Sequence, residues 1–254
     1  MPTLANLPPV TALPAVPATA VSAVSRGLPD LSHAPWRLSG VVLGPLLNDP
    51  RSLEAIGQAA CQPPYRAPPM APVLYVKPRN TLRGSGGSLE VPAGAPGFVV
   101  GACLGMVIGR TAHRVSAEQA LACVAGWTLV VDLFLPHDDF YRPSVSLRAR
   151  DGSCWLGPSM VRLAEGVDPA GVPVRVQVGS GHAVELCGQG FVRPAAVLLQ
   201  DVSDFMTLHP GDVLMLGVSH DAPLATAGDT IRVEAPGFGT LAGQLVAAEA
   251  KGCA

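Results

Sequence analysis

The amino-acid sequence predicts a β-rich α+β domain with about three helices. Most of its apolar segments are short and end at glycine, proline or aspartate, which is typical of strands joined by turns. Beyond residue 160 the chain is expected to consist mostly of strands, and Gly-Asp pairs precede two of them. At 254 residues, 48% of them hydrophobic, the chain is long enough to bury one large core.

The first elements expected are a strand, a helix and a second strand. Residues 36–47 (WRLSGVVLGPLL) form the strand, and the helix begins at Asp49 and Pro50, which are favourable N-cap and N1 residues. Residues 73–82 (VLYVKPRNTL) form an apolar strand that ends in a charged turn. The glycine-rich residues 84–97 are expected to be turns. A phosphate-cradling loop leads into a helix and this one does not, which argues against phosphate binding.

The middle of the chain predicts two long strands with a helix between them. The strands are residues 98–109 (FVVGACLGMVIG) and 128–136 (TLVVDLFLP). Residues 116–127 are predicted to be the clearest helix, because Ser116 and Gln119 form a capping box. Apolar residues at helical spacing support this helix, namely Ala120, Leu121, Val124 and Ala125.

The last third of the chain predicts a hairpin, a helix and further strands. Residues 172–187 (VPVRVQVGSGHAVELC) have the pattern of a β-hairpin around Gly-Ser-Gly. Residues 193–208 predict a helix that Pro194 opens. The remaining strand-rich pieces are residues 211–218, 228–241 and 243–250.

The amino-terminal residues 1–33 are expected to form a flexible extension rich in proline and alanine, followed by a single domain over residues 34–254. Lysine and arginine are absent before Arg26, and five prolines interrupt any helical core of a signal peptide. A cleaved export signal is the less favoured alternative. Since no uncharged apolar run reaches the ~18–20 residues of a membrane span, we expect a cytoplasmic protein without membrane contact.

The charge and the spacing of the cysteines argue against nucleic-acid binding and against a zinc site. The formal net charge of −2 and the scattered lysines and arginines argue against binding to nucleic acid. The six cysteines form no Cys-x-x-Cys pair, so a zinc site is not expected. They are expected to be free thiols in a reducing compartment.

Four segments in this order resemble the fumarylacetoacetate hydrolase (FAH) family. They are APVLYVKPRNTL (71–82), VIGRTAHRVSAEQALACVAGWTLVVDLFLP (107–136), FYRPSVSLRARDGSCWLGPSMV (140–161) and FMTLHPGDVLMLGV (205–218). The resemblance covers about residues 36–250. It implies a mixed β-roll, usually dimeric, that isomerises, decarboxylates or cleaves unsaturated 2-oxo or 2-hydroxy acids.

The resemblance also implies a divalent metal, Mg²⁺ or Mn²⁺, held by three carboxylates. A hard ion of this kind can chelate a 2-oxo acid and stabilise the enolate that forms. The family's Glu-x-Glu pair corresponds to Gly101 and Cys103, and only Asp132 matches a family ligand. Glycine has no side chain and Mg²⁺ does not favour sulfur. We therefore expect that this chain alone binds no metal.

One branch of the family, the bifunctional isomerase/decarboxylases of 4-hydroxyphenylacetate degradation, contains two copies of the fold. The amino-terminal copy has Gly-Ala and apolar residues where the other copy has its glutamates. The present chain resembles that copy at LPHDDFYRP (135–143) and RDGSCWLGP (150–158). In some bacteria the copies are separate subunits, and the chain resembles the first of them.

The catalytic candidates that follow from the resemblance are Arg148, Asp151 and His137. Arg148 stands where the family has a lysine, and a guanidinium can grip a carboxylate but cannot act as a base near neutral pH. A surface arginine, a turn aspartate and a histidine in a surface loop are the respective alternatives.

The substrate-binding candidates are Tyr141, Arg142 and Lys77, and a solvated loop is the alternative for Lys77. Asp132 is the metal-ligand candidate, and a hydrogen-bonded carboxylate beside a vacated site is its alternative. Cys103 is expected to be a small core or pocket-wall residue, with a reactive thiol as the less favoured alternative.

Two functions are compatible with these observations. The first is a subunit of a 2-hydroxyhepta-2,4-diene-1,7-dioate isomerase and 5-carboxymethyl-2-oxo-hex-3-ene-1,7-dioate decarboxylase (a C–C lyase), working as a homodimer or with a metal-bearing paralogue. The second is a catalytically silent scaffold or carboxylate-binding module that partners an active paralogue.

Overall fold

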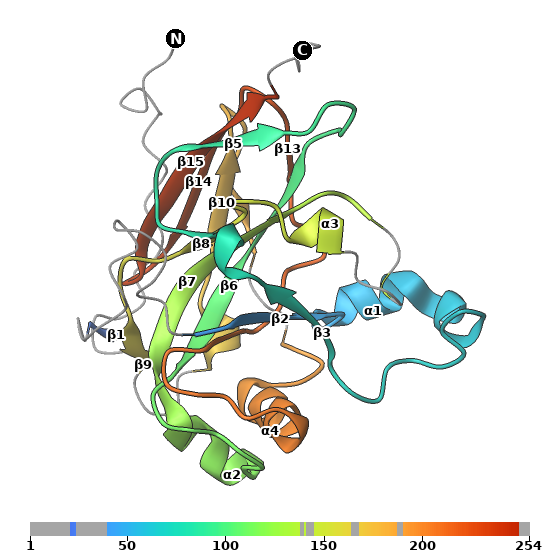
Figure 1. Ribbon diagram of the computed structural model, residues 1–254, viewed down its shortest axis with the longest axis vertical. Coiled ribbons are helices and arrows are strands. Elements are labelled where there is room, and N and C mark those ends of the chain that lie inside the picture. Colours follow the sequence, from blue (N-terminus) through green and yellow to red (C-terminus); the bar gives the residue numbers. More distant parts are fainter. Residues whose placement is uncertain are drawn as a thin grey trace.

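The computed structural model describes residues 21–23, 40–137, 140, 145–163, 168–186 and 190–248, and it contains two β-sheets (Figure 1). The sheets mix parallel and antiparallel pairs, and the helices are short. The predicted β-rich α+β roll is confirmed. None of the helices in the described part has the length and hydropathy that crossing a bilayer takes.

The large sheet is built around two long antiparallel strands, β6 (Phe98–Ile108) and β7 (Val124–Phe134). Its order is β1-β9-β7-β6-β12-β2-β3. The other strands on this path are β1 (Val21–Ala23), β9 (Val161–Leu163), β12 (Val213–Met215), β2 (Val42–Leu46) and β3 (Val73–Lys77). Strands β4 (Leu82–Arg83), β8 (Cys154–Leu156) and β13 (Leu224–Ala225) pair off this path. Strand β1 lies within the predicted extension and pairs with β9, and the domain limits stay a prediction.

The small sheet has the order β11-β10-β14-β15-β5. Its strands are β11 (Val184–Glu185), β10 (Arg175–Val178), β14 (Thr230–Ala235), β15 (Gly239–Ala247) and β5 (Ser88–Val91). Strands β10 and β11 confirm the predicted hairpin. Strands β14 and β15 form a second hairpin, and β5 joins β15 in parallel.

Trp155 connects the two sheets. This side chain on β8 is fully buried, and its indole nitrogen donates to the Gly152 carbonyl at 2.9 Å. A Cβ atom added at Gly243 of β15 would lie 2.5 Å from the Trp155 ring, so only glycine permits this approach. The core therefore lies between the sheets.

The α-helices in the described residues are α1 (Pro50–Ile56), α2 (Ala117–Ala120), α3 (Val145–Arg148) and α4 (Ala195–Phe205). Short 3₁₀ turns are η4 (Gly57–Cys61), η5 (Arg79–Thr81), η6 (Leu121–Cys123) and η7 (Pro169–Gly171). The predicted starts of two helices are confirmed, because Asp49 caps α1 and Pro194 is the N-cap of α4.

The predicted helix over residues 116–127 is wrong beyond Ala120. Helix α2 ends there, η6 follows, and β7 begins at Val124. Val124 and the residues after it pair with β6, with a register shift beside Ile108. Pairing with a long neighbouring strand outweighs the weak local helical pattern.

Asp49 is expected to stabilise the fold through the start of α1. Its carboxylate accepts the backbone N–H of Arg51 at 2.9 Å and that of His220 at 2.8 Å. Burial raises the pKa of Asp49, but the hydrogen bonds and the charge of Arg51 outweigh it and hold the pKa below 3.8. The stabilisation is therefore present above pH 4 and is lost as pH falls through the lowered pKa.

Asp49→Ala should lower the free energy of unfolding by about 1 kcal/mol at pH 7. Urea unfolding measures this loss, which should shrink below pH 4. Glu54→Ala, at an exposed position of the same helix, is the matched control and should change little. An equal loss at pH 7 and at pH 3 would contradict the role of the carboxylate.

Candidate active site around Asp132

Asp132 lies in the middle of the large sheet. It is opposite Gly101 of β6 on one side and Cys154 of β8 on the other. Its side chain is fully buried, so the carboxylate needs partners to offset the loss of water.

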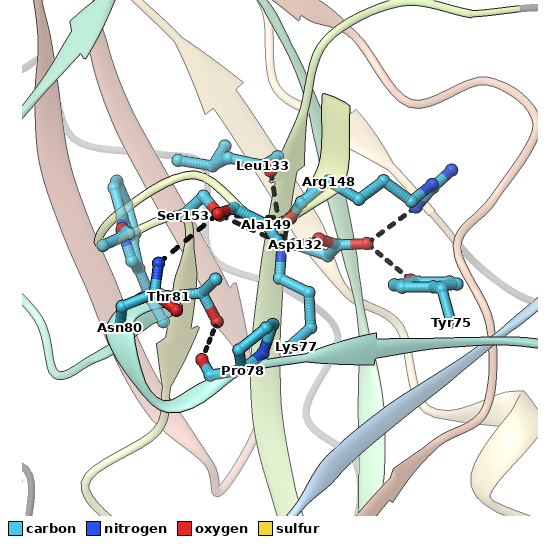
Figure 2. Close-up of polar contacts among 12 residues, drawn as sticks. Tyr75, Lys77, Pro78, Asn80, Thr81, Asp132, Leu133, Arg148, Ala149 and Ser153 are labelled. Carbon is cyan, nitrogen blue, oxygen red and sulfur yellow. Dashed lines mark hydrogen bonds and ion pairs between the residues drawn. The ribbon is translucent and has the colours of Figure 1, made fainter. Parts of the chain in front are cut away.

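Three side chains surround the Asp132 carboxylate (Figure 2). Lys77 Nζ lies 2.7 Å from Oδ1, and Arg148 Nη1 donates to Oδ2 at 3.1 Å. The Tyr75 hydroxyl also donates to Oδ2. Tyr75 and Lys77 are two residues apart on β3, so both side chains leave the same face of that strand. We call Asp132, Lys77, Arg148 and Tyr75 the Asp132 cluster.

Lys77 is 1% exposed, so a solvated loop is excluded for this residue. Besides Asp132, its ammonium group donates to the backbone carbonyl of Arg148 and to Ser153 Oγ, the latter at 3.0 Å. It also donates to the Leu133 carbonyl at 3.5 Å, so acceptors are present for all three of its N–H donors beside the ion pair with Asp132. Lys77 therefore anchors the cluster to α3 and β8.

Arg148 is 4% exposed, which excludes a surface arginine. Its guanidinium carbon lies 4.3 Å from the Tyr75 ring centroid and 3.9 Å from that of Phe134. Its Nε donates to His137 Nε2 at 3.0 Å. These contacts with Tyr75, Phe134, Asp132 and His137 therefore fix the orientation of the guanidinium.

Charge compensation controls the ionisation of the cluster. Burial alone would raise the pKa of Asp132, but the charges of Lys77 and Arg148 outweigh it and hold this pKa below its ordinary value. Burial and the Asp132 charge raise the pKa of Tyr75 well above its ordinary value. At neutral pH Asp132 is therefore a carboxylate and Tyr75 is a neutral donor.

Gly101 and Cys103, which the resemblance aligns with the two family glutamates, lie in closely packed surroundings. A Cβ atom at Gly101 would lie 2.6 and 2.7 Å from the two methyl carbons of Val218. Cys103 is 5% exposed, and burial raises the pKa of its thiol to about 12, so it is a neutral thiol at pH 7. It packs in an apolar cluster with Val130, Cys154 and other residues.

The structure brings together only part of the predicted site. His137, Arg148, Lys77 and Asp132 form one connected network. Asp151 instead lies in an exposed turn, where it accepts a hydrogen bond from Asn80, and in the described part of the chain it does not contact Asp132. Tyr141 and Arg142 lie outside the described residues.

Sequence analysis missed Tyr75, Phe134 and Ser153. Tyr75 carried a usable signal, because it precedes Lys77 by two residues on a predicted strand. Phe134 and Ser153 carried no sequence signal that indicates a place in the site.

The residues around Asp132 do not fit a divalent metal ion. Such an ion needs several oxygen ligands, and both Asp132 oxygens already face cationic or hydroxyl donors. The side chains of Lys77 and Arg148 would also repel it. Among the described residues, no three His, Cys, Asp or Glu side chains come together as a possible metal site.

Fold and site together define a β-roll protein whose interior holds one buried carboxylate paired with two cations. The chain belongs to the fumarylacetoacetate hydrolase family, since the family profile "Fumarylacetoacetate (FAA) hydrolase C-terminal" matches residues 42–246. The resemblance drawn from the sequence is confirmed.

Curated relatives include the 4-hydroxyphenylacetate degradation bifunctional isomerase/decarboxylases of Salmonella dublin and Escherichia coli. Both are 34% identical to this chain, the first over 210 residues and 83% of the chain. The chain spans about half the length of these relatives, 48% in each case.

Solved structures agree with this assignment. The 5-carboxymethyl-2-hydroxymuconate delta-isomerase of Mycobacterium smegmatis has a TM-score of 0.66 and 25% identity, over 84% of this chain and 81% of the other. The 2-hydroxyhepta-2,4-diene-1,7-dioate isomerase of Mycobacterium marinum has a TM-score of 0.64 at 24% identity, over 83% and 75%, and supports the fold alone.

Proposed function

We propose that the chain is one subunit of an isomerase/decarboxylase of aromatic catabolism. Its substrates would be 2-hydroxyhepta-2,4-diene-1,7-dioate and 5-carboxymethyl-2-oxo-hex-3-ene-1,7-dioate. The names of its 34% identical relatives support the pathway. A partner of the same family that carries the metal-binding glutamates is proposed to supply the metal-dependent step.

We further propose that this subunit does not hold the catalytic metal. One observation carries this proposal: Asp132 is compensated by Lys77 and Arg148, while Gly101 and Cys103 offer no oxygen ligand. In the family the metal polarises a 2-oxo acid, and that chemistry would come from the partner. The residues of this chain would bind and orient an anionic group through Arg148.

The second candidate function is a catalytically silent scaffold. The contact of Val218 with Gly101 favours it, because the Val218 methyl groups fill the space that a side chain at position 101 needs. In that case the chain would stabilise an active paralogue without contributing a residue to turnover.

The test compares three preparations: this chain, a paralogue that carries the Glu-x-Glu pair, and the co-expressed complex. Each is assayed for isomerisation and decarboxylation, and each is titrated with Mn²⁺ by calorimetry. We expect no tight Mn²⁺ site and no turnover for this chain alone, and higher turnover for the complex than for the paralogue. A paralogue whose two glutamates are replaced by Gly and Cys is the control.

Tight Mn²⁺ binding or turnover by this chain alone would refute the metal-free assignment. Equal turnover by the paralogue with and without this chain would favour the scaffold.

A further inference from the structure

We infer that two copies of this chain pair along the free edge of strand β3, strand against strand, across a two-fold axis. The inference goes beyond the proposed function and does not depend on it, since it requires neither a metal ion nor a substrate. It names the interface, the register of the pairing and a second copy of the chain as the occupant.

Strand β3 has an open edge. It ends the strand order of the large sheet, and among the described residues only β2 pairs with it (Figure 1). An open edge presents unpaired backbone N–H and C=O groups to any other strand. The edge of the small sheet at β5 differs, because Arg83 Nη1 donates to the Ser88 carbonyl at 3.0 Å and so covers it.

The hydrogen-bond pattern shows which residues of β3 face this edge. Val213 of β12 donates to the Val41 carbonyl at 2.8 Å, so the odd-numbered residues of β2 direct their backbone groups at β12. The even-numbered residues of β2 therefore face β3, where they lie opposite its odd-numbered residues. Leu74 and Val76 accordingly direct their N–H and C=O groups at the free edge, and within the described ranges these four groups have no hydrogen-bond partner.

The side chains along this edge favour contact with another strand. Val76 is 47% exposed, and Val41 on the neighbouring strand is 43% exposed. The one charged side chain of β3, Lys77, is buried against Asp132 and cannot repel an approaching strand. Edge strands are usually protected by an exposed charge or a bulge, and β3 has neither.

The sequence around β3 is complementary to itself. Pro72 and Pro78 stand three positions before and after Tyr75, and a proline has no N–H to donate. In an antiparallel pair centred on Tyr75, Leu74 lies opposite the partner's Val76, and the two residues exchange two N–H···O=C bonds. The free groups of both copies are then all bonded.

Other registers do not achieve this. A slip of two residues puts a proline opposite Leu74 or Val76, and a slip of one residue turns the free groups of the partner away. The occupant that fits this edge is therefore a second copy of this chain, in a contact that uses the same patch on both subunits. Because opposite residues of an antiparallel pair share a face, the two Asp132 clusters would lie on the same face of the joined sheet.

Sedimentation equilibrium of the full chain over a range of concentrations measures the dissociation constant of the dimer. We expect a dimer, and Val76→Pro should raise its dissociation constant at least about tenfold, because each copy loses one N–H donor. An edge strand tolerates proline where the N–H faces outward, so this variant should keep its fold. Val76→Lys should act in the same direction, because it adds a charge at the edge.

Two control variants should leave the dissociation constant unchanged. Val76→Thr keeps the backbone donor and a β-branched side chain at the same position. Val145→Lys adds a charge at another exposed valine, which is 74% exposed and lies on α3. Thermal unfolding shows whether each variant is folded, and Val76→Lys carries the test if Val76→Pro is not.

Amide hydrogen exchange, followed by NMR, locates the interface in the unchanged chain. In the dimer the Leu74 and Val76 amides should exchange slowly, and dilution below the dissociation constant should make both fast. The Tyr75 amide faces β2 and should stay slow at both concentrations.

A monomer at every concentration would overturn the inference, and so would a dimer whose Leu74 and Val76 amides exchange fast. A dimer that both Val76→Pro and Val76→Lys leave intact would do the same. Slow exchange that appears only after a glutamate-bearing paralogue is added would assign the edge to that paralogue and exclude the second copy. None of these measurements uses turnover or metal binding, so their outcome is separate from that of the activity assay.

Discussion

Asp132→Asn is expected to destabilise the fold by about 3–5 kcal/mol, the loss that follows when one partner of a buried ion pair is removed. The substitution leaves Lys77, at 1% exposure, and Arg148, at 4%, without a carboxylate. Neither ammonium nor guanidinium can return to water without opening the sheet around β7. The amide nitrogen also adds a donor where three donors already converge.

Urea unfolding at pH 7 measures this loss. Asp151→Asn, at an exposed turn, is the matched control and should stay within about 0.5 kcal/mol of the unchanged chain. Lys77→Met in the Asp132→Asn background should recover part of the stability, because it removes one uncompensated charge. If Asp132→Asn unfolds like the unchanged chain, the cluster is not the electrostatic centre described above.

Gly101→Ala is expected to destabilise the chain by about 1–3 kcal/mol, the usual range for overpacking a core. The direction of this stability change is informative, because a Gly-to-Ala change in an unstrained strand normally stabilises the protein. Here the new Cβ atom would lie 2.6 Å from a methyl carbon of Val218 and 3.0 Å from the Asp132 carbonyl oxygen. The methyl groups of Val218 therefore occupy the space that a side chain at position 101 needs.

A double-mutant cycle with Val218→Ala tests this explanation. In the Val218→Ala background, Gly101→Ala should lose most of its destabilising effect, which gives a coupling energy of about 1 kcal/mol or more. Gly171→Ala is the control, since a Cβ atom there meets nothing within 4 Å. An unchanged penalty in the double variant would show that the backbone of Asp132, and not Val218, excludes the side chain.

The presence and order of the main strands could largely be predicted from the sequence, whereas several of their ends could not. The apolar runs that became β6 and β7, the hairpin of β10 and β11, and the cap at Asp49 depend on local patterns, and the structure confirms them. The helix predicted over residues 116–127 failed, because its second half pairs with a strand on the other side of a turn. Local patterns do not contain that information.

The site could be predicted only in part, for a similar reason. Asp132 stood out as an acid in an apolar run, and Arg148 followed from the family resemblance. The ion pair of Lys77 with Asp132 joins β3, at one end of the strand order, to β7, and β6, β12 and β2 stand between them in that order. No sequence spacing indicates a contact between these two strands. The sequence therefore predicts a substrate-binding role for Lys77 and not an ion pair with Asp132.

The pairing of β2 with β12 and of β5 with β15 has a consequence for biosynthesis. Each pair joins an early strand to a late one, and Val41 is hydrogen-bonded to Asp212, 171 positions further along the chain. On the ribosome, the early strands emerge long before their neighbours exist, so both sheets can be completed only when translation of this region is nearly finished. Until then their apolar edges are open to chaperones and to other nascent chains.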